Sequence, residues 1–155
     1  MTSDETRHDE LPAVGTPPSP CFETLAVGDE LPPLTKGPLE RVQLVKYAGA
    51  SGDFNPIHVD EPFAKSAGYP SVFAHGMLSM AFLGELLTSW VDPRQLRELG
   101  VRFVAITWPG DTVRARATVA RKFEAEGERR VELAVWTENQ DGKHTLDGTA
   151  VVGFP

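Results

Sequence analysis

Residues 76–91 read GMLSMAFLGELLTSWV, and this apolar segment decides how the rest of the chain folds. Apolar side chains occur nearly all round a helix drawn through it, which predicts a helix buried on most of its surface. Glu85 lies in its middle, and the segment is shorter than the roughly 20 residues that cross a bilayer. We therefore expect a helix in the protein core and no partnership with a membrane.

The chain changes to a period of two after this segment, which predicts strands. In TVRARATVA (112–120) small apolar side chains alternate with polar ones, and Asp141-Gly142 is a strong hairpin signal between two later strands. The pattern predicts a four-stranded antiparallel meander made of residues 101–107, 112–120, 130–138 and 145–154.

Two shorter helices and a strand are expected before the apolar segment. Residues 38–50 fit a helix that ends at glycines, with Val42 and Val45 on its apolar stripe. Residues 60–68 fit a helix capped by Asp60. One more strand is expected near residues 22–34. A sheet curled around helix 76–91 lets each cover the other's apolar face, so the predicted fold class is α+β.

Composition limits the organisation and the partners of the chain. Its 155 residues suit one domain, which we place at residues 21–155, after an acidic and proline-rich tail at residues 1–20 that we expect to be disordered. Fifteen Lys and Arg against 22 Asp and Glu give a net charge of −7, which argues against nucleic acid as a partner. The single cysteine, Cys21, and the lack of a visible targeting segment predict a cytoplasmic protein.

The residues best suited to chemistry lie between the two shorter helices. Asp53 and His58 are five residues apart in the loop SGDFNPIHVD, which is a good place to project side chains into a cleft. A carboxylate and an imidazole that converge can hold a water molecule and move protons near neutral pH. The same residues also suit an ordinary surface turn. A metal is not expected, because a third suitable ligand is missing nearby in the sequence.

A second candidate is Gly76, at the predicted N-terminus of the long helix. Unpaired backbone N–H groups and the positive end of the helix dipole collect there, which suits the stabilisation of a developing oxyanion. The alternative is that Gly76 only allows a tight start to the helix, while His75 before it caps or packs.

Together, YAGASGDFNPIHVDEPFAKSAG and the later FAHGMLSM resemble the MaoC-like hydratase/dehydratase family, which includes the (R)-specific enoyl-CoA hydratases. The resemblance covers about 130 residues, from FETLAVGDELPPL to VRFVAITWPGDTVRARATV. The positions that match the family's signature are Tyr47, Ser51, Gly52, Asp53, Asn55, Pro56, Ile57, His58 and Ala64.

This resemblance implies a hot-dog fold, an antiparallel sheet wrapped around a long central helix, usually paired into dimers. It implies hydration of a trans-2-enoyl thioester, normally of coenzyme A, to the (R)-3-hydroxyacyl thioester, with the thioester as substrate and no separate cofactor. Asp53 and His58 then hold the attacking water, with Asp53 as the leading base and His58 as its partner and candidate acid, and the way in which the two share the proton stays open. Gly76 then meets the thioester carbonyl with its amide, and Asn55 braces the loop.

Several alternatives stay open at this level. A homodimer is expected, and in a heterodimer this chain would be the catalytic half because it carries the pair. Hot-dog proteins also include thioesterases, for which Glu85 is the one candidate carboxylate, and non-catalytic thioester-binding subunits. The acyl chain length, the choice between coenzyme A and acyl carrier protein, and the physiological direction are not given by the residues.

Overall fold

The computed structural model describes residues 20–155, so the predicted tail lies outside the described residues except for Pro20. The helices are α1 (Arg41–Ser51), α2 (Glu61–Ser66) and α3 (Gly76–Trp90), with short 3₁₀ turns η1 (Phe22–Thr24), η2 (Pro56–His58) and η3 (Pro93–Gln95). The strands are β1 (Leu34–Lys36), β2 (Leu96–Phe103), β3 (Val113–Ala125), β4 (Glu128–Glu138) and β5 (His144–Phe154).

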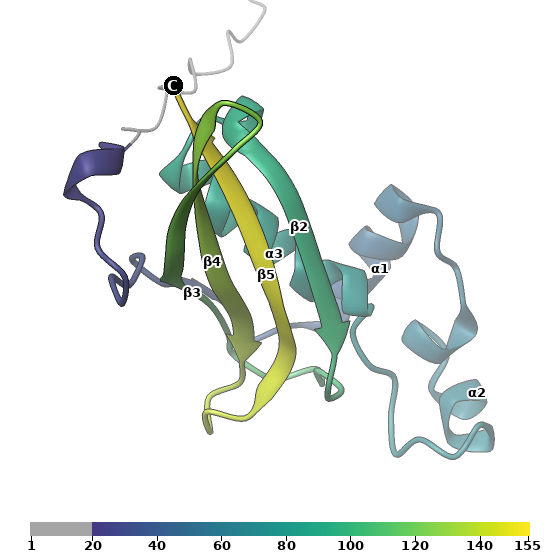
Figure 1. Cartoon of the computed structure of the whole chain (residues 1–155). Coiled ribbons are helices and arrows are strands. Elements are labelled where there is room, and N and C mark those ends of the chain that lie inside the picture. The colour runs from purple at the N-terminus through teal and green to yellow at the C-terminus, as the bar shows by residue number, and fades with distance from the viewer. Residues whose placement is uncertain (1–19) are drawn as a thin grey trace, which may run out of the picture.

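The five strands form one antiparallel sheet in the order β1-β3-β4-β5-β2, with α3 packed behind it (Figure 1). The predicted α+β class is therefore confirmed. The four-strand meander is wrong in one respect, because only β3, β4 and β5 follow one another in space. The free edge of β3 pairs with β1, through Leu34 and Ala115, so β2 joins the sheet at the opposite edge, beside β5.

Two strand predictions are also corrected. The strand expected at residues 101–107 instead spans Leu96–Phe103. It ends there because the N–H groups of Val104 and Ala105 both donate to one carbonyl, that of Thr145, which breaks the ladder. The strand expected near residues 22–34 is reduced to a bridge at Glu30 and to β1, since two prolines at 32–33 lack the N–H that a ladder needs.

Both helices expected before the sheet are present, but α1 begins at Arg41 rather than at residue 38, and α2 ends at Ser66 rather than at residue 68. Helix α1 ends at Gly52, whose φ of +75° suits a residue without a Cβ. The Asp60 side chain caps α2 by accepting a hydrogen bond from the Phe63 N–H at 3.0 Å. The predicted apolar stripe of α1 is wrong, because Val42 and Val45 are exposed while Leu44 and Ala48 face the core.

The core lies between α3 and the inward face of the sheet. Helix α3 buries Leu78, Leu83, Leu86 and Leu87, and the alternating residues of β3 and β4 are buried opposite them, as their period predicts. The expectation that α3 is buried on most of its surface is not met, since only six of its 15 residues are buried and Met77 and Glu85 are exposed. The sheet covers one face of the helix and leaves the other open.

Within residues 20–155, no helix is both long enough and apolar enough to cross a membrane.

Adjacent residues of α3 provide a test of this packing. Leu83 is completely buried, so Leu83→Ala should lower the free energy of unfolding by about 2–5 kcal/mol through lost burial and a residual cavity. A Cβ added at Gly84 meets open space, so Gly84→Ala should raise it by up to about 1 kcal/mol through helix propensity. Urea unfolding measures both changes. A Leu83→Ala protein as stable as the Gly84→Ala protein would contradict the described core.

Candidate functional site

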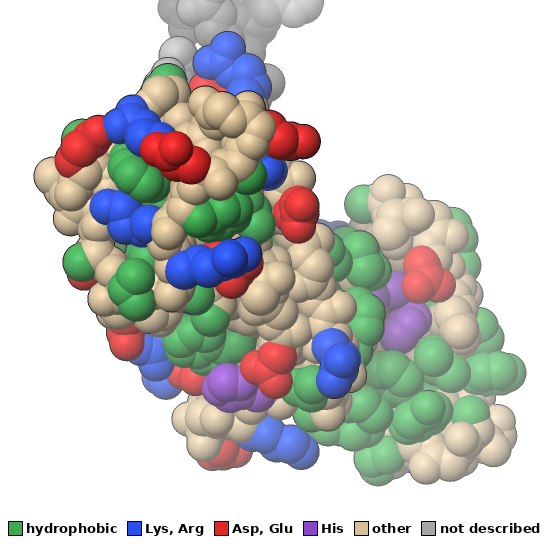
Figure 2. All heavy atoms as spheres, viewed as in Figure 1, with side chains coloured by type: hydrophobic (Ala, Val, Ile, Leu, Met, Phe, Trp, Pro, Cys, Tyr) green, Lys and Arg blue, Asp and Glu red, His purple; other side chains and the backbone are tan. Residues whose placement is uncertain are grey.

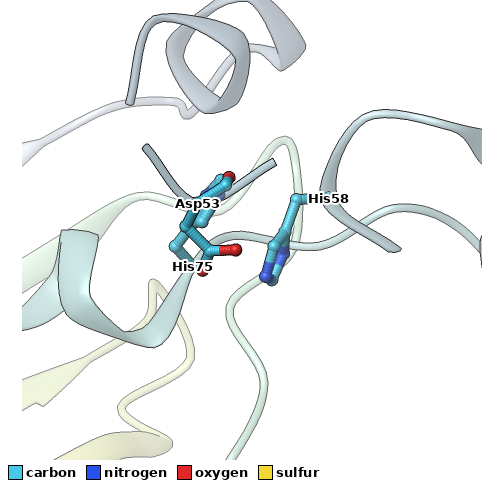
Figure 3. A group of neighbouring side chains, drawn as sticks. All are labelled: Asp53, His58 and His75. Carbon is cyan, nitrogen blue, oxygen red and sulfur yellow. The ribbon is translucent and has the colours of Figure 1, made fainter. Parts of the chain in front are cut away.

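Three side chains from separate segments converge at one place: Asp53 from the loop after α1, His58 from η2 and His75 from the residue that precedes α3 (Figure 3). One oxygen or nitrogen atom of each lies within 4.8 Å of the others. The structure therefore brings together the two residues that the sequence paired, and it adds a histidine 17 residues further along the chain than His58.

The loop that carries Asp53 is held by short-range hydrogen bonds. The Ser51 hydroxyl donates to the Tyr47 carbonyl at 2.7 Å and accepts from the Asp53 N–H at 3.2 Å. The Asp53 Oδ1 accepts from the Asn55 N–H, and the Asn55 Oδ1 accepts from the Ile57 N–H, both at 3.2 Å. Asn55, which the resemblance assigned to bracing this loop, thus links Asp53 to the turn that presents His58.

His58 is buried, with 7% of its surface exposed, and its tautomer is set by one contact. Its Nδ1 lies 2.7 Å from the Phe73 carbonyl oxygen. Because a carbonyl only accepts, Nδ1 carries the hydrogen, and the lone pair of the neutral ring is on Nε2. Any proton that His58 takes up or releases during a reaction therefore moves at Nε2.

The electrostatic environment keeps this imidazole neutral. Burial is the largest effect and lowers the pKa of His58, and repulsion from His75 lowers it further. The bond to the Phe73 carbonyl and attraction to Asp53 raise the pKa of His58, but the net shift is below its ordinary value. Near neutral pH, His58 therefore presents a lone pair next to the exposed carboxylate of Asp53.

His75 is the site residue that sequence reasoning missed. It is 2% exposed, its ring stacks on the His58 ring at a centroid distance of 3.8 Å, and its Nε2 lies 3.0 Å from the Asp53 carbonyl oxygen. The sequence signal was its place directly before the predicted helix, which suggested a cap or packing. Its contact with Asp53 depends on how α3 packs, and no local pattern predicts that.

His75, the third residue of the site, bears on the expectation that no metal binds here. The folded chain brings the His75 imidazole, a suitable metal ligand, close to Asp53 and His58, so the expectation that no third ligand lies nearby is wrong. The ring planes of His58 and His75 are only 27° apart and face to face. A metal ion bound to an imidazole nitrogen lies in the plane of the imidazole ring. When two rings are stacked with nearly parallel planes, no point close to both rings lies in both planes. The stack therefore disfavours ligation by both rings.

Gly76 follows His75 as the first residue of α3, so its N–H is among those that a helix leaves without an intrahelical partner. It borders an apolar pocket of about 300 Å³ on the other side of the segment 73–77. A Cβ built on Gly76 would lie 2.6 Å from the Phe103 ring, which covers this position. The residues that line the pocket are Phe73, Ala74, Gly76, Met77, Ser79, Phe103, Ala105, Ile106, Thr107, Thr145 and Leu146.

The chain is similar in sequence to proteins of a known family. Residues 25–140 match the model of the MaoC like domain family. The chain is 33% identical over 111 residues to the (R)-specific enoyl-CoA hydratase of Rhodospirillum rubrum, a match that covers 70% of this chain and 75% of that protein. It is 37% identical over 67 residues to the peroxisomal hydratase-dehydrogenase-epimerase of Saccharomyces cerevisiae, covering 43% of this chain and only 7% of the length of that longer protein.

Among solved structures, the chain is similar to the (R)-hydratase from A. caviae involved in PHA biosynthesis. The TM-score is 0.74 at 27% identity, and the match covers 86% of this chain and 99% of that one. This likeness confirms the hot-dog fold that the resemblance implied.

The charges around His58 can be tested by its own titration. In wild-type protein, NMR should show His58 titrating below the usual histidine pKa of about 6.5. Asp53→Asn removes a charge that favours the imidazolium, so the pKa of His58 should fall further. The control Asp60→Asn keeps a good helix cap outside the site and should leave it unchanged. An upward shift in Asp53→Asn would contradict the described arrangement.

Proposed function

This chain belongs to the family of MaoC-like domains, and from that premise we propose that it adds water to trans-2-enoyl thioesters, such as enoyl-CoA, to form (R)-3-hydroxyacyl thioesters, or catalyses the reverse dehydration. One observation carries the proposal: a side-chain oxygen of Asp53 and a ring nitrogen of His58 lie within 4.8 Å of each other, close enough for one water molecule to bridge the two side chains. The bond from Nδ1 to the Phe73 carbonyl leaves Nε2 of His58 as the nitrogen that can accept a hydrogen bond from that water.

Each part of the site meets one requirement of the reaction. In hydration, the water oxygen bonds to C3 of the conjugated double bond, and one water proton passes to an acceptor of the pair. Electron density moves through C2 to the thioester oxygen, which becomes enolate-like. C2 then takes a proton from the protonated member of the pair, which restores the starting state. Water is the only co-reactant, and the double bond is consumed.

The division of labour between the two acceptors follows from the hydrogen bond to Phe73. The Nδ1 hydrogen of His58 is already donated, and the lowered pKa of this residue keeps Nε2 unprotonated. His58 therefore takes part as a proton acceptor at Nε2 in the resting site, alongside Asp53, rather than as a resident acid. This revises the role for His58 as the acid partner that the sequence left open.

The start of α3 and the pocket beside it suit the rest of the substrate. The Gly76 N–H lies at the positive end of a 15-residue helix, where an amide would stabilise the thioester oxygen as it gains charge. The pocket of about 300 Å³ next to Gly76 is mostly apolar, which suits an acyl chain. We propose that the acyl group enters this pocket with its carbonyl at Gly76.

We also propose that two copies of the chain pair. Hydrophobic side chains gather over the α1 and α2 region, on the part of the molecule that carries the loops between the helices (Figure 2). Phe54 and Phe63, which lie in this region, are 68% and 44% exposed, and contiguous exposed apolar surface on a soluble domain marks an interaction site. A homodimer of about twice 16.9 kDa would cover this surface, as the family resemblance implied.

A thioesterase remains the alternative of a different class. Its candidate carboxylate, Glu85, is on the exposed side of α3, in an ion pair with Lys36 at 2.7 Å. No observation favours this role for Glu85. With crotonyl-CoA as substrate, hydration removes the enoyl-thioester absorbance, hydrolysis instead releases a thiol, and a non-catalytic binding subunit does neither.

The catalytic pair is tested by removing each member. Asp53→Asn and His58→Ala should each lower kcat for crotonyl-CoA hydration by roughly a hundred-fold or more, because general acid–base assistance is lost. KM should change much less, since neither side chain lines the acyl pocket. Asp60→Asn is the control and should match wild type. A variant of Asp53 or His58 that keeps more than about a tenth of the wild-type kcat contradicts the assignment.

The role of Gly76 is tested together with the ring that covers it. Gly76→Ala should lower kcat by about a hundred-fold, the scale of a lost oxyanion donor, because a methyl group hinders close approach of the carbonyl. The same methyl group displaces the Phe103 ring, so Phe103→Ala and the double variant separate the two effects. Kinetics should show Phe103→Ala changing mainly KM, with the double variant as slow as Gly76→Ala. Recovery of kcat in the double variant would mean that Gly76 only makes room for Phe103.

A further inference from the structure

His75 contacts both Asp53 and His58 and directly precedes Gly76, although it does not line the acyl pocket and is almost fully buried. Its Nε2 is bonded to the backbone of Asp53, its ring stacks on His58, and its own chain neighbour is Gly76. The Tyr47 ring also packs against His75, at a centroid distance of 5.0 Å and a tilt of 59°. A residue that only fills space in the core would not need an imidazole to make these contacts.

The hydrogen bond to Asp53 fixes the tautomer of His75. The carbonyl oxygen of Asp53 only accepts, so Nε2 of His75 carries the hydrogen and donates it over 3.0 Å. The other nitrogen, Nδ1, is the one buried side-chain nitrogen or oxygen atom without a hydrogen-bond partner among residues 20–155. The stacked rings therefore hold opposite tautomers, with hydrogen on Nδ1 in His58 and on Nε2 in His75.

We propose that His75 is the positioning residue of the site: its Nε2–H anchors the Asp53 backbone to the start of α3, and its ring holds His58 in the orientation that presents Nε2. This inference rests on the proposed hydratase function. This role of His75 explains how Asp53, which lies in an exposed loop, is held at a fixed position relative to the N-terminus of α3.

The same stack also tunes the charge of His58. The titratable groups that act on His58 are Asp53 and His75, and the phenol-bearing ring of Tyr47 lies against His75. When His75 also takes up a proton on acidification, repulsion between the two stacked rings opposes protonation of His58, so removing the second imidazole raises the pKa of His58. An enzyme that needs neutral His58 then loses activity at a higher pH as the solution is acidified.

Two substitutions divide the contacts of His75 between them. His75→Gln keeps an N–H donor near the position of Nε2 but removes the ring. His75→Phe keeps a ring for the stack but leaves the Asp53 carbonyl without its donor. His144→Gln is the matched control, since His144 stacks on Trp136 and contacts Asp147 outside the site.

Steady-state hydration of crotonyl-CoA over a range of pH should separate these effects. We expect kcat to fall by roughly ten- to a hundred-fold in His75→Phe, which is the scale of a misplaced catalytic group. The loss of kcat in His75→Gln should be several times smaller than the loss in His75→Phe. KM should stay within about two-fold of the wild-type value in both variants. The acidic limb of kcat/KM should move to higher pH in both variants and stay in place in His144→Gln. A His75→Phe enzyme as active as His75→Gln, or an unmoved acidic limb, would overturn the proposal.

A measurement on the wild-type protein keeps the proposal testable if the variants unfold. NMR of the imidazole nitrogens distinguishes the two neutral tautomers, and it should show hydrogen on Nδ1 of His58 and on Nε2 of His75. Hydrogen on Nδ1 of His75 would refute the anchor to Asp53. This readout needs no substrate. A wild-type protein that shows these tautomers but does not hydrate enoyl-CoA would instead refute the proposed function.

Discussion

Burial of one face of α3 against the curled sheet is the interaction on which the rest of the structure depends. Each of the leucines that this helix buries contributes about 1.5–3 kcal/mol, and the inward residues of β3 and β4 complete the same core. Because α3 begins abruptly at Gly76, this packing also fixes where a helix N-terminus, with its free N–H groups, meets the rest of the molecule. The position of the site is therefore a consequence of core packing.

The polar loop after α1 is ordered by different means. It buries little, and it depends on a chain of side-chain bonds to the backbone through Ser51, Asp53 and Asn55. Such bonds define the shape of the loop but not its place on the molecule. Two hydrogen bonds between residues farther apart in the sequence fix that place, one from His58 to the Phe73 carbonyl and one from His75 to the Asp53 carbonyl. Both are donated by imidazoles, which ties the protonation of the site to its geometry.

This coupling has a chemical advantage. Two imidazoles packed face to face, each with one nitrogen committed to a carbonyl, leave a single accessible lone pair beside a carboxylate. Burial and the neighbouring ring both oppose a positive charge on His58, which suits the proton-acceptor role that we propose for this residue. The open face of α3 and the exposed aromatic side chains near the loops are the surfaces on which we propose that a substrate and a second copy of the chain bind.

Local patterns in the sequence were sufficient for the elements that repeat or that carry their own signals. The alternation in β3 and β4, the Asp60 cap of α2, the left-handed Gly52 after α1 and the start of α3 at Gly76 all follow from short-range chemistry, and the Asp53 and His58 pairing follows from a compact motif. The place of β2 beside β5, the outward stripe of α1 and the role of His75 were decided only by the tertiary structure. Each of these features depends on contacts between segments that are dozens of residues apart in the sequence. The hydrogen-bond partner of His75 is a backbone carbonyl that packing elsewhere brings near, and the identity of a side chain does not specify such a partner.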